Sequence, residues 1–495
     1  MKSHRLIFLL ILLSVLPCAL KAQFNSRLLS LEDAIEIAKQ QSPDAFNSKQ
    51  EFRISFWEFR HFRALYLPAL RLDANIPNFT RQYTSYLGKN GQRTYVFEQY
   101  ISAKANLALE QKIGVTGGTI SLNSELTAEK NLPLTDTNQF VSIPVYIKFD
   151  QPLFQFNPYR WDRKIEPLKY DLAKRKFLED VENIAIYTTN YFFNLLQAQL
   201  DQKIALTNLS NYDTLYHIAK GRYQLGKIAE NDLLQLELSY LRAQANVETA
   251  SLDLESALFQ FKSYLRIKDT VDIELIPPID IRFFKIDPVL AIQESNRNTS
   301  TALDFKKRLL EAARDVNKAK RDDRFDANIS AEIGLTKNGP YLNDVYTNPD
   351  DLERFSLQLT IPILDWGVSR GEIKKAQSQE EIVKNSVEQE IIDYQRNIYL
   401  KAVQFNMQQN QILIAAKSDT VARKSYEVTK GRYLIGKPVT ILELNNAQIE
   451  TDASRKSYFS TLQTFWSSYY EIRKLTLFDF RNNVPLSFDI KDIKL

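Results

Sequence analysis

The 495-residue sequence is poor in the residues that build metal sites, disulfides and tight turns. It has one cysteine and three histidines, which excludes a disulfide framework and a zinc site made of cysteine and histidine. With only 13 glycines and 17 prolines, long uninterrupted elements are expected. The formal net charge is +4, and Lys2, Arg5 and Lys21 carry three of these charges. The near-neutral remainder argues against nucleic acid as a partner.

Residues 1–22 have the pattern of a secretory signal peptide. Lys2 and Arg5 precede an apolar run, 6–16, and Ala22 is a small residue at a suitable cleavage point. The run is too short to cross a bilayer as a helix, and no later stretch approaches about 18 apolar residues. Cys18 would carry a lipid if the chain were a lipoprotein, but the proline before it argues against that processing. We therefore expect export, with any membrane passage made by β-strands.

The chain contains an internal duplication. The motif Lys-Gly-Arg-Tyr followed by Gly-Lys occurs at 220–227 and again at 430–437, a shift of 210 residues. The same shift relates Pro152 to Pro362. A constant offset over such a distance indicates two copies of one structural unit.

The first copy is longer than the second. Asp73–Ile76 corresponds to Asp326–Ile329 with a shift of 253, so 43 extra residues, the difference between the two shifts, lie between 76 and 149. This stretch contains a further alternating pair, Tyr95–Ile113 and Thr119–Thr127. Both an extra hairpin and an elongated surface loop are compatible with that pattern.

Hydrophobic periodicity follows one order in both copies. Residues 31–67 have helical spacing, with Ser30 as candidate N-cap and a break at Ser42-Pro43. Alternation then predicts half-buried strands. These strands are 141–149 in the first copy, and 325–335 and 355–363 in the second.

Two very long helices follow the strands, at 157–220 and 366–430, each with a second helix after a glycine-containing turn. About 60 residues make a helix of roughly 90 Å, so the helices must lie against one another as a coiled-coil-like bundle. We expect five segments, in order: signal peptide 1–22, first repeat 23–268, linker 269–285, second repeat 286–477 and C-terminal tail 478–495.

Four clear strands cannot close a barrel, and an open sheet edge in a membrane leaves unpaired backbone groups. Four strands from each of three chains would close a twelve-stranded barrel. We expect a mainly α fold with β: a long antiparallel α-helical coiled-coil barrel, plus four, possibly six, strands per chain in a trimeric transmembrane β-barrel. The alternative is a secreted or periplasmic coiled-coil scaffold or adaptor outside the membrane.

Several motifs resemble the TolC-like outer membrane factor family over essentially the whole mature chain. Leu31–Ala38 is similar to its opening helix, 151–154 and 361–367 to its strand-to-helix junctions, and 222–226 and 432–436 to its helix-hairpin tips. The resemblance implies a homotrimer in the outer membrane of a Gram-negative cell, with its helical part in the periplasm. It implies a passive efflux or type I secretion conduit, docking a periplasmic adaptor and working with an inner-membrane pump or ABC exporter.

The resemblance also assigns roles to residues. The expected tip and adaptor-docking residues are Arg222, Tyr223, Gly226, Lys227, Arg432, Tyr433, Gly436 and Lys437. Asp232 and Tyr433 match positions that bond across a closed tip. Members of the family often place acidic residues six and nine positions beyond the second glycine, where this chain has Leu442 and Asn445. Either the second tip has one extra residue near Pro438, which makes Glu443 a gate candidate, or a full acidic constriction is missing. Alternatively, Glu443 is an ordinary first-turn glutamate.

Aromatic residues gather where strand meets helix, at the expected inner boundary of the membrane, where they could equally form a packed collar. They are Phe154, Phe156, Tyr159, Trp161 and Trp366. The chain has no nucleophile–base motif, and the glycines at 114–118 lack a phosphate-loop lysine. We expect no enzyme activity, cofactor or metal. The cargo is not encoded in these patterns.

Overall fold

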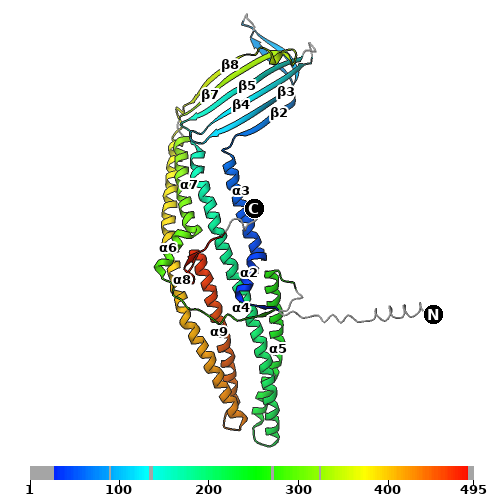
Figure 1. The fold of residues 1–495 in the computed structure, drawn as a ribbon, viewed down its shortest axis with the longest axis vertical. Coiled ribbons are helices and arrows are strands. Elements are labelled where there is room, and N and C mark those ends of the chain that lie inside the picture. Colours follow the sequence, from blue (N-terminus) through cyan, green and yellow to red (C-terminus); the bar gives the residue numbers. More distant parts are fainter. Residues whose placement is uncertain (1–26, 88–90, 133–137, 269–272, 323–324, 489–495) are drawn as a thin grey trace, which may run out of the picture.

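The computed structural model describes residues 27–87, 91–132, 138–268, 273–322 and 325–488. The chain is elongated, with a sheet at one end and two helical hairpins at the other (Figure 1). The predicted signal peptide and Cys18 lie outside the described residues.

The N-cap predicted at Ser30 and the break predicted at Ser42-Pro43 are both confirmed. α2 (Leu31–Gln41) starts in a capping box, in which Asp33 N donates to Ser30 Oγ at 3.2 Å and Ser30 N donates to Asp33 Oδ2 at 3.3 Å. α3 (Pro43–Ala64) follows a break at Ser42, whose Oγ accepts from Ala45 N at 3.1 Å. Proline at the first helical position has no amide to satisfy, which explains why the chain restarts a helix there.

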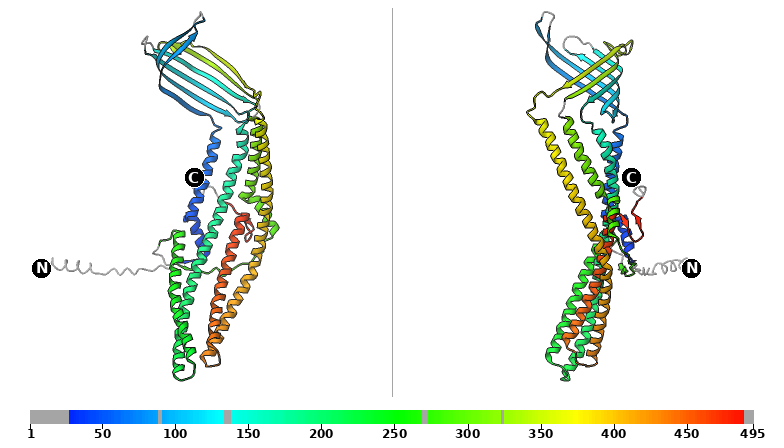
Figure 2. Two further views of the ribbon diagram at one scale, coloured as in Figure 1. Left: turned by 180° about the vertical axis from the view of Figure 1, so that it is seen from behind. Right: turned by 90° about the vertical axis from the view of Figure 1, so that its left-hand side faces the viewer.

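Four long helices form the two hairpins. α4 (Pro158–Gln224) and α8 (Val368–Leu434) have 67 residues each, and α5 (Glu230–Leu265) and α9 (Ile441–Thr476) have 36 each. At 1.5 Å per residue the longer pair extends about 100 Å. The α4–α5 and α8–α9 hairpins lie side by side through α4 and α9 (Figure 2). The predicted pairs of long and shorter helices are therefore confirmed.

Shorter elements complete the helical part. α6 (Pro288–Asn298) and α7 (Ser300–Asp322) repeat the order of α2 and α3. Two small strand pairs lie outside the main sheet: β1 (Arg27–Leu29) pairs with β6 (Ile273–Leu275), and β9 (Phe478–Asp479) pairs with β10 (Val484–Pro485). There is also a 3₁₀ turn, η1 (Asp344–Tyr346).

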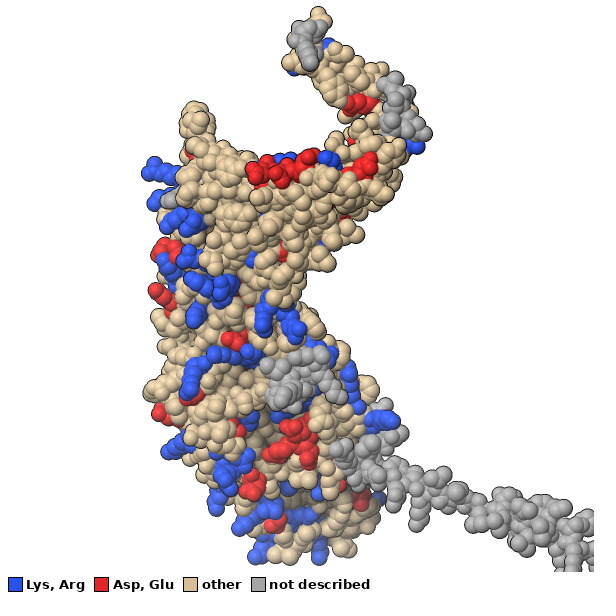
Figure 3. All heavy atoms as spheres, turned by 45° about the horizontal axis from the view of Figure 1, so that its top comes forward, with Lys and Arg blue, Asp and Glu red and all other residues tan. Residues whose placement is uncertain are grey.

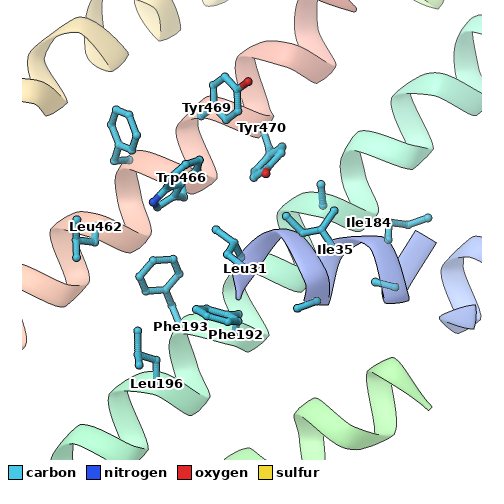
Figure 4. Close-up of a cluster of buried hydrophobic side chains, with 14 of the residues drawn as sticks. Leu31, Ile35, Ile184, Phe192, Phe193, Leu196, Leu462, Trp466, Tyr469 and Tyr470 are labelled. Carbon is cyan, nitrogen blue, oxygen red and sulfur yellow. The ribbon is translucent and has the colours of Figure 1, made fainter. Parts of the chain in front are cut away.

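The main core lies where α2, α4 and α9 meet, near the middle of the molecule. Ile35, Phe192 and Trp466 come from these three helices and point toward one another (Figure 4). A buried ion pair lies beside this core, with Arg473 Nη2 3.0 Å from Glu182 Oε1. Burial raises the pKa of Glu182, against the attraction of the Arg473 guanidinium. The core therefore joins the two hairpins at the end that lies away from their tips.

The sheet has six strands in the described part of the chain, in the order β2-β3-β4-β5-β7-β8. They are β2 (Ala69–Leu87), β3 (Arg93–Ile113), β4 (Gly118–Asn131), β5 (Asn138–Leu153), β7 (Asp326–Gly339) and β8 (Asp350–Thr360). Every neighbouring pair is antiparallel. Strands β3 and β4 contain the extra alternating pair, so the inserted stretch is a hairpin and not a loop.

The sequence predicted four clear strands per chain and allowed six, and six take part in the sheet over the described residues. One expectation needs correction. The last predicted strand, 355–363, in fact runs from Asp350 to Thr360. It stops there because Pro362 has no amide to donate to a neighbour and because the chain turns toward α8.

The β2–β3 hairpin is longer than the rest of the sheet. β2 and β3 pair from Ala69–Glu110 to Leu87–Arg93, whereas β4 pairs with β3 only as far as Tyr100. Residues 81–87 and 93–99 therefore form a two-stranded ribbon that projects beyond the sheet (Figure 1).

None of the helices in the described ranges is both long and apolar enough to cross a membrane.

Candidate functional site

The two hairpin tips have matching turns that differ in length by one residue. Gly226 and Gly436 have φ values of +68° and +76°, a conformation that costs glycine little. α5 begins six residues after α4 ends, whereas α9 begins seven residues after α8 ends. The extra residue lies between Gly436 and Thr440, the region around Pro438. The second tip is thus one residue longer than the first, and the two sequence alternatives for the acidic constriction stay predictions.

Arg222 joins the two tips of one chain. Its guanidinium lies over the Tyr433 ring, with Cζ 5.2 Å from the ring centroid. Nη1 and Nη2 each donate to the Tyr433 carbonyl at 3.3 Å, and Nη2 also donates to the Leu434 carbonyl at 3.1 Å. A guanidinium suits this role because its planar fork can donate to two carbonyls and stack on a ring at once. The contact holds the end of α8 against the end of α4.

The repeated counterparts of these residues have no such contact within the described chain. Arg432 reaches only the Pro438 carbonyl of its own turn, at 3.5 Å. Tyr223 is 40% exposed, whereas Tyr433 is 5% exposed. The duplicated Arg-Tyr motif therefore makes one contact between the hairpins, that of Arg222 with Tyr433. Its other arginine and tyrosine, Arg432 and Tyr223, make no contact with each other within the described chain.

A small apolar core supports the tips. Its buried members are Leu215, Ala219, Leu236, Tyr433, Ile441 and Leu444. Burial raises the pKa of Tyr433, against Arg222, which lowers it, and Asp232 adds to the increase. The Tyr433 hydroxyl has no hydrogen-bond partner among the described residues, so the expected Asp232–Tyr433 bond is not formed within this one chain. Asp232 and Tyr433 stay a prediction as gate residues.

Glu443 has a structural role at the start of α9. Its amide donates to Thr440 Oγ1 at 3.1 Å, and Thr440 N donates to Glu443 Oε2 at 3.2 Å, which makes a capping box. Glu443 thus fits the interpretation of a first-turn glutamate, and its part in a gate is untested.

A polar row above the tips links the hairpins, and the sequence reading missed it. Lys430 Nζ donates to Asn211 Oδ1 at 2.6 Å, Tyr212 OH to Asn445 Oδ1 at 3.1 Å, and Asn208 Nδ2 to Asp452 Oδ2 at 2.8 Å. Burial raises the pKa of Asp452 although Asn208 and Gln448 hydrogen-bond to it. Polar residues at core-facing helical positions were the signal that could have located this row.

Of the five predicted aromatic residues, Phe154 and Tyr159 contact other aromatic rings between the sheet and the helices. The Phe154 ring lies 4.8 Å from that of Phe325, and the Tyr159 ring 5.6 Å from that of Tyr66. Trp366, at the start of α8, is 89% exposed. Tyr66 and Phe325 belong to the same collar, and sequence reasoning had not singled them out.

One face of the six-stranded sheet is apolar on every strand. Residues of this face in direct register, and partly or largely exposed, include Leu72 with Leu107, Leu109 with Leu122, Ile147 with Ile333, and Leu357 with Ile329. The opposite face has ion pairs, among them Lys104–Glu125 at 2.7 Å and Arg354–Glu332 at 2.8 Å. In Figure 3, charged side chains are spread over the helices, and the visible sheet surface is mainly uncharged apart from a row of charges. Soluble monomers rarely expose so extended an apolar surface.

Comparisons with known proteins agree with this geometry. Residues 305–475 match the family model described as outer membrane efflux protein. No curated protein matches the sequence.

Solved outer membrane channels have the same fold over nearly the whole chain. The Campylobacter jejuni CmeC outer membrane channel has a TM-score of 0.66 at 14% identity, covering 94% of this chain and 88% of that one. The outer membrane protein VceC of Vibrio cholerae gives 0.63 at 13%, covering 90% and 95%. The open state of the Neisseria gonorrhoeae MtrE outer membrane channel gives 0.61 at 13%, covering 90% and 88%. The resemblance suggested by the sequence motifs is confirmed.

Proposed function

We propose that this chain, with its efflux-family segment at 305–475 and the fold of solved outer membrane channels, is the outer-membrane conduit of an export system. Three copies join their sheets into one barrel in the outer membrane, and their helices form a tunnel through the periplasm. The conduit is passive: an inner-membrane pump or ABC exporter supplies the energy and a periplasmic adaptor bridges the two.

The two-faced sheet is the observation that carries this proposal. Apolar side chains such as Leu107, Leu122 and Phe355 suit a lipid surface, and Phe355 is 70% exposed. The ion-paired face suits a water-filled lumen, because charges there keep their hydration. In a scaffold that stays in water the apolar face would need a cover, and none is present in the described chain.

The open edges of the sheet support assembly from several copies. β2 and β8 each have one neighbour, so each presents unpaired amides and carbonyls along its outer side. Such groups cost several kcal/mol each in lipid. Because all pairs are antiparallel, β8 of one copy can pair with β2 of the next in the same sense, and three copies then close the ring.

The tips act as the closed gate in this proposal. Within each copy, Arg222 holds Tyr433. Between copies, the duplicated motif makes the equivalent contact, with Arg432 of one copy on Tyr223 of its neighbour. The exposure of both residues in the single chain supports this arrangement. Six such contacts would close the periplasmic end, with Asp232 beside them.

Adaptor docking loosens this gate. Gly226, Lys227, Gly436 and Lys437 are exposed at the ends of the hairpins, where a helical hairpin of an adaptor can reach them. Docking shifts the closed–open equilibrium only if the adaptor binds the open tips more tightly.

The exposed aromatic collar, with Phe154 and Trp366, marks the inner membrane boundary in this proposal.

Membrane fractionation tests the proposal. Recovery in the outer membrane as a heat-modifiable trimer that forms channels in planar bilayers is expected. A soluble monomer in the periplasm would instead support the alternative, a coiled-coil scaffold.

A further inference from the structure

We propose that the β3–β4 hairpin widens the barrel, so that cargo too bulky for a twelve-stranded barrel can leave through it. The inference rests on the proposed function, since it concerns the barrel of that conduit. It starts from the duplication, in which β2 and β5 of the first copy correspond to β7 and β8 of the second. β3 and β4 have no counterpart and stand between the two equivalent strands.

The inserted strands are full members of the sheet. β3 pairs with β2 in a register that continues from Ala69–Glu110 to Leu87–Arg93, interrupted by one irregularity. β4 pairs with β3 without interruption from Gly118–Ile113 to Asn131–Tyr100. β4 also pairs with β5, which leads into α4. Removing the hairpin therefore takes out two strands from the middle of the sheet.

The hairpin has the same two faces as the rest of the sheet. Leu107 of β3 and Leu122 of β4 lie on the apolar face and are 44% and 45% exposed. Lys104 and Glu125, which form an ion pair across the hairpin, lie on the polar face. A loop folded over the outside of a finished barrel would not need this alternation.

The lower turn of the hairpin is fixed between the helices. Asn157, the N-cap of α4, donates from Nδ2 to the carbonyls of Gly114 and Val115 at 3.3 and 3.2 Å. Gln111 Nε2 donates to the carbonyl of Tyr66, just after α3, at 2.9 Å. A Cβ on Gly117, whose φ is +85°, would lie 3.2 Å from Asn157 Cγ, so the close approach favours glycine. The turn thus occupies the space between the tops of α3 and α4.

The dimensions of the helices match six strands per copy. α3, α4, α7 and α8 connect to the sheet, and four helices at about 8–10 Å spacing span an arc of about 32–40 Å. Strands about 4.8 Å apart and tilted about 40° each take about 6.3 Å of circumference. Six strands then span about 38 Å, whereas four span about 25 Å. Three copies give a backbone diameter of about 36 Å, against about 24 Å for twelve strands.

The wider lumen identifies the class of cargo. After about 10 Å is allowed for side chains on opposite walls, about 26 Å remains, against about 14 Å for the narrower barrel. A cargo about 20 Å across, such as a compact polypeptide, fits only the wider lumen. The hairpin is therefore a size determinant at the outer end of the conduit.

Labelling of a lumen cysteine on intact cells tests this inference. The probe site is Ser330→Cys, on the polar face of β7, in a Cys18→Ser background, which has no other cysteine. Deletion of residues 81–132 joins a short β2 to β5, as β7 is joined to β8. A small maleimide should label both proteins equally. A maleimide polymer about 20 Å across should label the full-length protein at least tenfold faster than the deletion variant.

A matched control keeps all six strands. Replacement of residues 82–98 by Asn-Gly, a two-residue hairpin turn, shortens only the projecting ribbon and should leave the size limit unchanged. If the polymer labels the full-length and deletion proteins at equal rates, the inference about barrel width is wrong, but the proposed conduit function is not contradicted. If the small maleimide labels neither protein, the proposed conduit itself is wrong.

A second measurement covers failure of the deletion variant to fold. In the full-length protein, Ser121→Cys on the polar face of β4 should react with a charged maleimide at least tenfold faster than Leu122→Cys on its lipid face. Equal reactivity would mean that the hairpin lies outside the barrel wall and would overturn the inference.

Discussion

Asp232 and Glu443 occupy the same position, the third residue of α5 and of α9, yet only Glu443 closes a capping box. The N-cap of α9 is Thr440, whose hydroxyl accepts from the Glu443 amide, whereas the N-cap of α5 is Ala229, which has no side-chain acceptor. The duplicated tips therefore differ in local stability as well as in length. The carboxylate of Asp232 is free of a capping role and is available for the gate.

This difference predicts unequal effects of mutation at the two helix starts. Thr440→Ala should destabilise the first turn of α9 by about 1 kcal/mol, because it removes the acceptor for the Glu443 amide. Glu443→Gln should keep most of the protection of these first-turn amides against hydrogen exchange, since glutamine also closes a capping box. Amide hydrogen exchange of residues 441–444 measures both. Ala229→Gly is the matched control in the first tip, and an equal loss of protection there would contradict the assignment.

The tip contact predicts how the closed state can be loosened. Arg222→Ala should raise the open population about tenfold, because it removes charged hydrogen bonds and a cation–π contact worth about 1.4 kcal/mol together. Arg432→Ala should act similarly if its contact lies between copies, and the double variant should exceed either single one. Single-channel conductance in planar bilayers is the measurement. Unchanged conductance in both single variants would show that these arginines do not hold the gate.

Asp232 and Tyr433 give a second test of the same gate. Asp232→Arg reverses a charge beside the Arg222–Tyr433 contact, and Tyr433→Ala removes its ring, so both should increase conductance. Tyr433→Phe is the matched control. It keeps the ring on which the Arg222 guanidinium lies and removes only the hydroxyl, so it should increase conductance less than Tyr433→Ala.

The two faces of β8 predict opposite tolerance to charge. Leu359 lies on the apolar face and Gln358 on the polar face. Leu359→Asp should cost about 2 kcal/mol of insertion free energy, because it puts a carboxylate against lipid, whereas Gln358→Asp should insert normally. The recovered amount of outer-membrane trimer reports the difference. Equal recovery of the two variants would mean that the faces are assigned the wrong way round.

The start of α8 predicts a pH dependence at low pH. Hydrogen bonds from Ser369 and Gly367 lower the pKa of Asp365 to about 2. Since the folded pKa lies below the usual value, the stabilisation is present above pH 4 and is lost as the pH falls toward 2. The protection factors of the amides of residues 367–370, which compare the measured exchange rate with the intrinsic rate at the same pH, should therefore fall over that interval. In Asp365→Asn this dependence should disappear.

Much of the fold could be predicted because duplication and periodicity are local signals. The cap at Ser30, the break at Ser42-Pro43 and the long helices could be predicted from neighbouring residues alone. β2 could not be read in the same way, since an irregularity between Asn75 and Asn78 shifts the alternation. Apolar residues lie at even positions before it, as at Leu72, and at odd positions after it, as at Phe79.

The site was predicted less completely because its contacts join distant parts of the chain. The repeated motifs identified both tips, including Arg222 and Tyr433, but not that these two residues contact each other across the hairpins. The polar row with Asp452 was missed for the same reason. Its partner Asn208 is 244 residues away, and neither residue belongs to a motif.

The ribbon formed by residues 81–87 and 93–99 has a practical consequence. In the proposed orientation it is the part of the protein that stands furthest out from the cell, and Tyr83 and Tyr95 on it are 71% and 67% exposed. An epitope tag inserted at Gly91 would therefore be recognised by antibody on living, unpermeabilised bacteria. Such staining would show the topology of the chain without purification.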